Sequence, residues 1–385
     1  MKKASKLITT ECVSFGHPDK VADQISDAIL DAYLAQDKDA KIAVETMVKD
    51  QIVVLGGEVT SKAVVDIDKV VREAVKEVGF TKEQGFYWED IKILNLIGKQ
   101  SPEINRAVVH NDEELGAGDQ GFMVGYAIND TPNAMPVGMY VARKLCDYVV
   151  KVKGLGKDLK TQVTVEEFDS NVKRIDAILI STMHNLKEYN LEQLTAFLKD
   201  SILTNKMGLE NNIFGLIDVN TKIFINPAGS WSIGGPVADC GLTGRKIVVD
   251  QYGASCTVGG GAFSGKDYSK SDRAGAYLCR YVAKNIVKAG IAHECKVEIA
   301  YMIGVAEPVS VNLEMHDSNK QKIEISEELK EQILNMFPLT PSKIIKKFSM
   351  KEPMYFQTAK NGHFGNEIMP WEQTDLAEKL KSIIS

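Results

Sequence analysis

A histidine, a proline and several carboxylates stand close together in HPDKVADQISD, residues 17–27. His17 and Asp19 are residue types that suit the edge of a site for a metal ion and an anion. Pro18 also suits the first turn of a helix, and Asp19 suits the positive end of the helix dipole. The stretch therefore fits two interpretations, a metal and anion site or a helix start with a solvated acidic face.

A second candidate is the glycine-rich stretch GGGAFSGKDYSKSDRAGAY, residues 259–277. Gly260 to Lys266 fit the G-x-x-x-x-G-K spacing of a phosphate-binding loop, which needs Ser or Thr at the next position. Here that position is Asp267, and nine residues separate the end of the preceding stretch KIVVD, a predicted strand, from Gly260. These two departures exclude a Walker-type nucleotide fold.

The chemistry of an anion site remains in this stretch without that fold. Lys266 and Lys270 bring two cations close together, and Ser271 is expected to cap a helix whose first turn holds Asp272. A helix N-terminus beside lysines favours phosphate, and an acid at that point suits a metal ion bound to the phosphate. The alternative is a flexible basic loop.

Three further stretches add charged side chains of the same kinds. DCGLTGRKIVVD carries Asp239, Arg245 and Lys246, DLKTQV carries Asp158 and Lys160, and GAGDQG carries Asp119. Each stretch alone more commonly forms a solvated turn. A triphosphate needs several such cations, because one cation about 4 Å from a phosphate oxygen contributes only roughly 4 kcal/mol at an effective dielectric near 20.

The composition limits the kinds of partner. The chain has 385 residues, a net charge of −6 and a pI near 5.7, so no overall basic field attracts nucleic acid or an anionic membrane. None of the six cysteines forms a C-x-x-C pair, and no secretory leader or apolar stretch of membrane-spanning length is visible. We expect a cytoplasmic protein with buried free thiols, no nucleic-acid partner and no membrane contact.

The order of predicted elements repeats three times. Apolar periodicity predicts strand, helix, two strands, helix and strand at residues 6–13, 18–35, 41–48, 51–59, 63–78 and 91–98. The same order follows at 122–128, 136–152, 162–168, 175–182, 191–203 and 222–226, and then at 246–250, 271–289, 295–306, 308–315 and 326–336, where the last strand is unclear. This order predicts an α+β protein of three domains with similar β-α-β-β-α-β topology.

Residues 98–121 fit no element, because they show no sustained apolar period and Pro102 interrupts them. Long stretches of this kind in compact domains are commonly either lids over active sites or disordered. We expect a lid.

The motifs resemble those of the S-adenosylmethionine synthetase family, also called methionine adenosyltransferases. The likeness rests on GHPDKVADQISDAILDAYL, GKQSPEI, GAGDQGFMVGYA, GGPVADCGLTGRKIVVDQYG and GGGAFSGKDYSKSDRAGAY, and NGHFGNE and PWEQTD extend it towards the C-terminus. It implies three pseudo-threefold-related domains and a homodimer with active sites at its interface, commonly paired as a dimer of dimers. We assign the domains to residues 1–101, 119–233 and 234–385, with a gating loop and linker at 102–118, and expect the structural domains to be interleaved in the sequence.

The resemblance also implies a reaction. ATP and L-methionine would give S-adenosylmethionine by attack of the thioether sulfur on ribose C5′, and the tripolyphosphate would be hydrolysed to pyrophosphate and phosphate before release. The implied cofactors are Mg²⁺, two per site, and K⁺. A thioether sulfur carries no proton, so this chemistry needs alignment and charge stabilisation but no general base.

Site residues follow from the resemblance position by position. His17 would contact the oxygen that leaves C5′, Asp19 and Asp272 would hold Mg²⁺, and Glu45 would hold K⁺. The polyphosphate would contact Lys160, Arg245, Lys246 and Lys266, the ribose would contact Asp158, and the remaining ATP contacts would come from Ser230, Trp231, Asp239 and Ala262. Methionine would contact Glu58, Gln100, Asp119, Asp239 and Lys270, with its ammonium group at Asp239 and its carboxylate at Lys270. The expected catalytic residues are His17, Lys160, Arg245, Lys246, Lys266, Lys270 and Asp272.

The sequence departs from the family pattern in three places. Phe15 stands where a glutamate is usual, Ser230-Trp231 replaces a basic residue followed by Phe, and Tyr268 replaces a proline. We expect Trp231 to stack on adenine and the loop around Tyr268 to be less rigid than a proline-containing loop.

Two other functions use the same kinds of residue. An ATP-dependent phosphotransferase would need the same cations and magnesium ions, but it would make ADP. A non-catalytic nucleotide-binding subunit would tolerate loss of Lys266, Lys270 or Asp272, and their joint presence argues against it.

Overall fold

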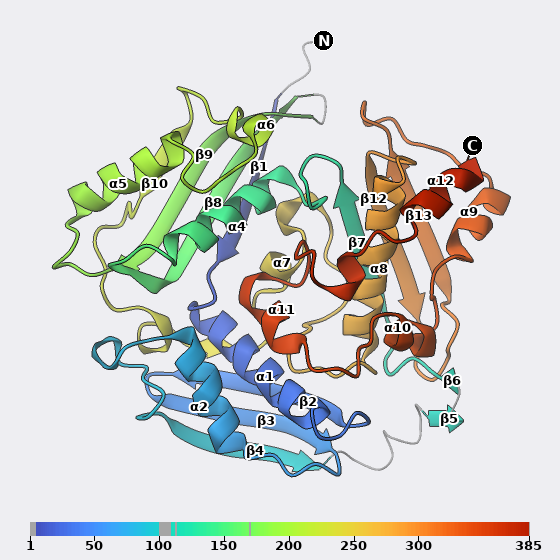
Figure 1. The fold of residues 1–385 in the computed structure, drawn as a ribbon, viewed down its shortest axis with the longest axis horizontal. Coiled ribbons are helices and arrows are strands. Elements are labelled where there is room, and N and C mark those ends of the chain that lie inside the picture. Colours follow the sequence, from blue (N-terminus) through green and yellow to red (C-terminus); the bar gives the residue numbers. More distant parts are fainter. Residues whose placement is uncertain (1–4, 100–108, 112–113, 169–170, 385) are drawn as a thin grey trace.

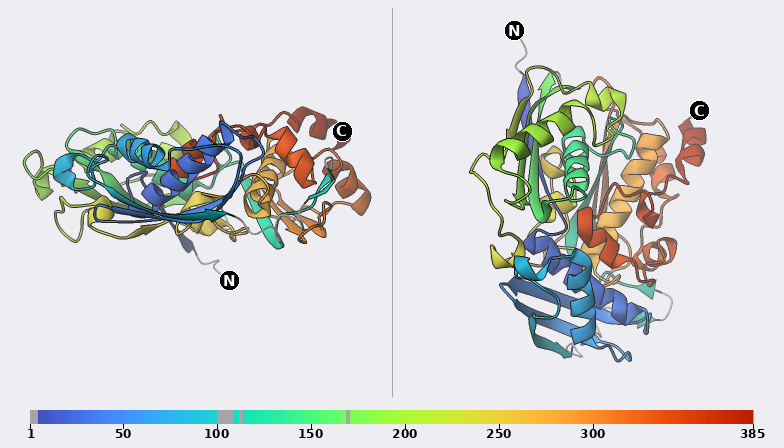
Figure 2. Two further views of the ribbon diagram at one scale, coloured as in Figure 1. Left: turned by 90° about the horizontal axis from the view of Figure 1, so that it is seen from below. Right: turned by 60° about the vertical axis from the view of Figure 1, so that its left-hand side comes forward.

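The computed structural model describes residues 5–99, 109–111, 114–168 and 171–384. Figure 1 shows three β-sheets, at the bottom, the upper left and the right of the view, with helices between and across them. Seen from below in Figure 2, the blue helices lie on one side of the blue sheet and leave its other side uncovered. The expected α+β class is confirmed, whereas a pseudo-threefold relation among the units stays a prediction.

The first sheet joins two distant parts of the chain. Its strand order is β11-β2-β3-β4, with β11 (Gly241–Leu242), β2 (Lys41–Lys49), β3 (Ile52–Thr60) and β4 (Lys92–Lys99). The β11–β2 and β2–β3 pairs are antiparallel, and the β3–β4 pair is parallel. Helices α1 (Pro18–Leu34) and α2 (Ile67–Val78) pack on one face, where Val21 and Ile25 of α1 meet Val44 and Val53 in the core.

The second sheet has the same succession of pairings. Its order is β1-β8-β9-β10, with β1 (Lys6–Val13), β8 (Leu155–Phe168), β9 (Asn171–His184) and β10 (Lys222–Ile225). Here β1–β8 and β8–β9 are antiparallel and β9–β10 is parallel. Helix α4 (Val137–Val149) contacts β1 and β8, α5 (Leu191–Leu203) contacts β10, and the short α6 (Asn211–Phe214) precedes β10.

The third sheet has the order β13-β12-β7 and is antiparallel throughout. Its strands are β7 (Gly121–Ile128), β12 (Glu294–Tyr301) and β13 (Ser310–His316). Helix α8 (Ser271–Lys288) lies on β7 so closely that a Cβ on Gly125 would stand 2.1 Å from the Cys279 carbonyl oxygen. The chain then forms α9 (Glu327–Leu334), α10 (Pro341–Lys347), α11 (Tyr355–Asn361) and α12 (Ala377–Ile384).

Most predicted elements are confirmed within a few residues, but the strand predicted for KIVVD is wrong. Residues Ile247–Asp250 form the short helix α7, in which the Asp250 N–H donates to the Lys246 carbonyl at 2.8 Å. The strand of this region is β11, which lies earlier and pairs with Val48 and Met47 of β2.

Two helix starts also differ from the prediction. Helix α2 begins at Ile67 rather than at residue 63, because the Asp66 side chain caps it by accepting from the Lys69 N–H at 3.1 Å. Ser271 does not cap α8: it is the first helical residue, Lys270 is the N-cap, and the Ser271 hydroxyl has no hydrogen-bond partner among the described residues.

The predicted lid lies mostly outside the described residues, which omit 100–108 and 112–113. Near its end, β5 (Val109–Asn111) and β6 (Glu114–Leu115) form a short antiparallel pair. Cys279 and Cys295 are buried free thiols, as expected. None of the helices in the described part of the chain has the length and apolar character to cross a membrane.

Candidate active site

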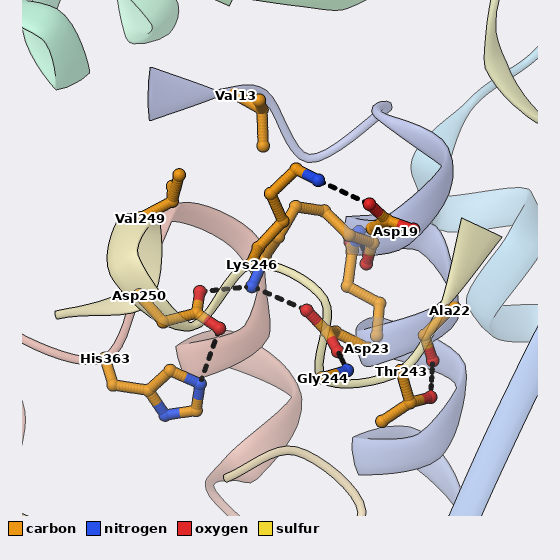
Figure 3. Close-up of polar contacts among 12 residues, drawn as sticks. Val13, Asp19, Ala22, Asp23, Thr243, Gly244, Lys246, Val249, Asp250 and His363 are labelled. Carbon is orange, nitrogen blue, oxygen red and sulfur yellow. Dashed lines mark hydrogen bonds and ion pairs between the residues drawn. The ribbon is translucent and has the colours of Figure 1, made fainter. Parts of the chain in front are cut away.

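Asp19, in the first turn of α1, gathers the cations that follow β11. Its carboxylate accepts a hydrogen bond from Lys246 Nζ (Figure 3). It accepts another from the Leu242 N–H at 2.9 Å, and Arg245 Nε lies 3.8 Å away. Burial alone would raise the pKa of Asp19, but the hydrogen bonds from Lys246 and Leu242 bring it below its ordinary value. The structure therefore places two predicted polyphosphate ligands at a predicted metal ligand.

His17 is the N-cap of α1 and is only 2% exposed. Its Nδ1 accepts a hydrogen bond from the Asp19 N–H at 3.2 Å, so the neutral ring carries its proton on Nε2. Burial, reinforced by the charges of Lys246 and Lys160, lowers the pKa of His17 to about 3. A neutral imidazole with its proton on Nε2 thus lies beside two of the predicted phosphate ligands.

Asp158 on β8 lies next to this group. It is buried and accepts a hydrogen bond from the Gly235 N–H at 2.8 Å. Burial raises the pKa of Asp158 to about 6; the Gly235 hydrogen bond and the Lys160 charge oppose this rise, and Asp239 adds to it. Because the charges of Lys160 and Asp239 act on Asp158, both side chains lie near it. Lys160 on β8 and Asp239 are exposed.

The predicted adenine neighbour Trp231 borders Asp158. A Cβ on Gly234 would lie 2.9 Å from the Trp231 ring and 3.1 Å from Asp158 Cβ, so both side chains pack against this glycine. A cavity of about 620 Å³ opens beside them, lined by Gly156, Met183 and Ser232 among others. Ser230 is exposed at the edge of this region.

A second group forms where the glycine-rich stretch meets α8. Lys266 Nζ lies 2.5 Å from Asp272 Oδ2, and Asp272 Oδ1 accepts from the Gly261 N–H at 2.9 Å. A Cβ on Gly261 would stand 3.2 Å from Lys266 Nζ and 2.9 Å from Asp272 Oδ2. The glycine therefore leaves the cation and the carboxylate open to a ligand from one side.

Lys270 and Asp119 belong to this second group. Lys270 Nζ lies 3.5 Å from Asp267 Oδ2, and Asp267 also accepts the Ile42 N–H at 2.7 Å. Gly118 lies against the Ser269 carbonyl, which a Cβ would approach to 2.3 Å, so the exposed Asp119 stands beside the segment of Lys270. Asp267, at the position where a Walker loop has Ser or Thr, acts here as a structural anchor.

The two groups are neighbours within one chain. Gly244 adopts φ +80°, and a Cβ there would lie 2.4 Å from the Cβ of Ala262. The segment that carries Lys246 and the loop that carries Lys266 therefore touch at Gly244 and Ala262. The first group contains His17, Asp19, Asp158, Lys160, Trp231, Asp239, Arg245 and Lys246, and the second contains Asp119, Lys266, Lys270 and Asp272.

Three predicted residues lie apart from these groups or outside the description. Glu45 and Glu58 are exposed on the first sheet, where Ala43 pairs with Glu58 and also forms a bridge to Lys266. Glu58 therefore flanks the second group, while Glu45 lies one pleat further along β2. Gln100 lies outside the described residues.

The metal predictions can be tested against the donor chemistry. Within the described parts of the chain, no three or more His, Cys, Asp or Glu side chains gather as a metal cluster. Asp19 and Asp272 each supply one carboxylate beside cations that are predicted to bind phosphate, which suits Mg²⁺, an ion usually held by one or two carboxylates together with substrate phosphates. Glu45 is a single exposed carboxylate, so K⁺ there would need oxygen atoms from elsewhere.

The departures from the family pattern have different consequences. Tyr268 is 1% exposed, and its ring centroid lies 4.0 Å from Lys41 Nζ and 5.5 Å from Lys351 Nζ. This packing argues against the expected loss of rigidity. Phe15 is half-buried, and its carbonyl accepts from Gln24 Nε2 at 2.6 Å.

Reasoning from the sequence missed the buried lysine beside the site. Lys20 contacts Asp23 and Asp250, which hold the segment of Lys246. The only signal in the sequence was the position of Lys20 directly after Asp19. Its burial could not be inferred from the apolar face of α1.

Comparisons with known proteins agree with this arrangement. The N-terminal, central and C-terminal domain models of S-adenosylmethionine synthetase match residues 5–102, 114–231 and 233–373. An S-adenosylmethionine synthase from Chlorobium phaeobacteroides is 43% identical over the full length of both chains. The solved structure of an unusual S-adenosylmethionine synthetase from Campylobacter jejuni is 36% identical, with a TM-score of 0.87 over 98% of this chain and 100% of the other. The chain belongs to the S-adenosylmethionine synthetase family.

Proposed function

We propose that this chain forms S-adenosylmethionine from ATP and L-methionine by attack of the methionine sulfur on ribose C5′, and that it then hydrolyses the tripolyphosphate to pyrophosphate and phosphate. The family and the names of both relatives support S-adenosylmethionine synthesis. The single observation that carries the mechanism is the meeting of His17 and Lys246 at Asp19, with Lys160 near enough for its charge to act on His17.

The triphosphate would lie along the cations of the two groups. Lys246 and Lys266 now pair with Asp19 and Asp272, and both lysines keep a partly exposed side chain. A phosphate oxygen can replace a carboxylate oxygen as their partner, because both are anionic acceptors. Arg245 can bind phosphate through its guanidinium group, and Lys160 and Lys270 extend the positive surface at either side.

His17 would act on the leaving oxygen rather than on the nucleophile. Its neutral ring can donate the Nε2 proton as a hydrogen bond to the oxygen that separates from C5′. That hydrogen bond strengthens as negative charge develops, so it favours the transition state over the bound substrate. The sulfur needs only alignment, which explains a site rich in cations and without an assigned general base.

The remaining contacts follow the two groups. Asp158 would accept a ribose hydroxyl, Trp231 would stack on adenine, and Ser230 and Ala262 would border the nucleotide. Methionine would bind at Asp119, Asp239 and Lys270, with Glu58 and Gln100 nearby. Asp19 and Asp272 would each hold a Mg²⁺ ion, which neutralises phosphate charge when bound, and Glu45 would contribute to a K⁺ site.

The outer face of the first sheet supports a homodimer with active sites at its interface. The exposed apolar side chains there are Met47, Ile52, Leu94, Leu96 and Leu242, and they lie on the same sheet as Glu45 and Glu58. A contiguous exposed apolar surface of this kind usually marks an interaction site. We further propose a dimer of dimers, a cytoplasmic location, pseudo-threefold-related domains with the boundaries given above, and no nucleic-acid partner.

Product analysis tests the reaction. The purified chain is incubated with ATP, L-methionine, Mg²⁺ and K⁺, and the products are separated by chromatography. We expect S-adenosylmethionine, pyrophosphate and phosphate in equal amounts, with no product when methionine is omitted. ADP formation would instead identify a phosphotransferase, and ATP binding without turnover would identify a regulatory subunit.

A further inference from the structure

Lys20 follows Asp19 directly on α1, yet its side chain is enclosed by the protein. It is 1% exposed and donates to Asp23 Oδ2 at 3.0 Å and to Asp250 Oδ1 at 2.6 Å. Both carboxylates are also buried. A fully buried lysine is rare unless it is paired, so this cation must have a function inside the fold.

The two carboxylates hold opposite ends of the segment that carries Lys246. Asp23 Oδ1 accepts the Gly244 N–H at 2.8 Å, and Asp250 ends the short helix α7. Figure 3 shows Asp23 beside Gly244 at one end and Asp250 at the other, with Lys246 reaching Asp19 between them. One ammonium group therefore connects both ends of a seven-residue segment.

The surroundings of Asp250 exclude substrate from this cluster. The His363 N–H donates to the Asp250 carbonyl at 3.0 Å, and Arg143 donates to the carbonyls of Val249 at 3.0 Å and Gln251 at 3.3 Å. Lys20 is thus enclosed between α1 and the segment, and at 1% exposure it leaves no room for a phosphate contact. Its hydrogen bonds can therefore influence catalysis through the position of the segment, apart from the effect of its charge on His17.

We infer that Lys20 is a positioning residue that, by bridging Asp23 and Asp250, fixes residues 244–250 so that Lys246 stands at Asp19 ready for the polyphosphate. The inference rests on the proposed function, because it assigns Lys246 to phosphate binding. Without the ammonium group, two buried carboxylates would face each other uncompensated. The segment would then shift or open, and Lys246 would lose its fixed position.

Binding of inorganic tripolyphosphate in the presence of Mg²⁺ tests this inference without turnover. We expect Lys20→Met to weaken the affinity, measured by calorimetry on the full chain, by about 10-fold, as for other residues that orient a ligand-binding side chain. The matched control is Lys284→Met. It removes another buried lysine, which lies on α8 with its Nζ 2.8 Å from Glu372 Oε2. This control should lose stability and keep its affinity.

A double-variant comparison separates positioning from general structural damage. Lys246→Met should weaken tripolyphosphate binding by itself, and Lys20→Met should then cause no further loss, because it acts through Lys246. Independent losses that multiply would overturn the inference, as would equal affinity losses in Lys20→Met and Lys284→Met.

The outcomes also distinguish the inference from the proposed function. If Lys246→Met leaves tripolyphosphate binding unchanged, the proposed function itself is wrong at this residue. If Lys246→Met weakens binding and Lys20→Met does not, only the positioning inference is wrong. Should Lys20→Met fail to fold, Asp250→Asn, which breaks one arm of the bridge, must show the same dependence on Lys246.

Discussion

Arg273 and Arg245 each face an aspartate of helix α1, but in opposite surroundings. The Arg273 guanidinium donates to both oxygens of Asp27 at 2.8 and 2.9 Å, and both side chains are fully buried. Arg245 is 55% exposed, and its Nε lies 3.8 Å from Asp19. One helix therefore carries a closed ion pair and an open one, eight residues apart.

The difference separates a charge that holds the fold together from a charge that a ligand can reach. Arg273 also donates to the Phe263 and Lys266 carbonyls at 3.0 Å, so it fixes the loop whose lysine side chain stays accessible. A buried pair cannot exchange partners without exposing a charge to an apolar interior. An accessible pair can, and under the proposed function Asp19 and Asp272 are the partners of their cations until a phosphate replaces them.

Breaking the closed pair should have the largest effect on stability. We expect Arg273→Met to lower the free energy of unfolding by about 3–5 kcal/mol, because Asp27 is left buried and uncompensated. Urea unfolding measures this change. Arg245→Met, its open counterpart, should change the unfolding free energy by less than about 1 kcal/mol.

The partner substitution sharpens that test. Asp27→Asn in the Arg273→Met background removes the uncompensated charge and should restore part of the lost stability. An Arg273→Met variant as stable as the Arg245→Met variant would contradict the distinction between the two pairs.

Breaking an open pair should affect turnover instead. We expect Lys266→Met to lower kcat by roughly 100-fold or more, comparable to removal of one preorganised donor from a charged transition state. Its unfolding free energy should change by less than about 1 kcal/mol, since Lys266 is partly solvated. Steady-state kinetics and urea unfolding on the same preparation measure both. A stable variant with normal kcat would remove Lys266 from the site.

The sequence indicated candidate residues of the second group, because these residues lie close together in the chain. Lys266, Lys270 and Asp272 lie within one stretch, and a glycine-rich loop before a helix indicates an anion site by itself. Their contact with the group around Asp19 was not visible, since it depends on Gly244 meeting Ala262.

Long-range contacts also explain what the sequence could not predict. IVV in KIVVD has strong strand propensity, yet it lies in α7, because Lys20 and Asp23 on a distant helix hold both ends of the segment. Likewise, the alternation in residues 6–13 predicts a strand but not that its partner is β8. Apolar periodicity shows which face of a strand or helix is buried, whereas tertiary packing decides which element it contacts.

Asp158 combines features of the closed and the open pair, because its carboxylate is buried and is also proposed to contact the ribose. Its pKa in the folded protein is about 6, against an ordinary value of 3.8. As pH rises between these values, the unfolded chain releases its proton first, so the contribution of Asp158 to stability is retained below pH 4 and lost as pH rises towards 6. The total loss is at most about 3 kcal/mol, from the two-unit shift.

Asp158→Asn should therefore separate stability from binding. An amide oxygen can still accept the Gly235 N–H but carries no charge, so the stability of the variant relative to the wild type should rise between pH 4.5 and 7.5. At pH 7.5 ATP should bind about 10-fold more weakly, because a charged acceptor for the ribose hydroxyl is lost. Urea unfolding at both pH values and calorimetry with ATP measure the two effects. A stability difference that does not change with pH would mean that Asp158 is ionised as easily as the exposed acids, and its burial would then have no electrostatic cost.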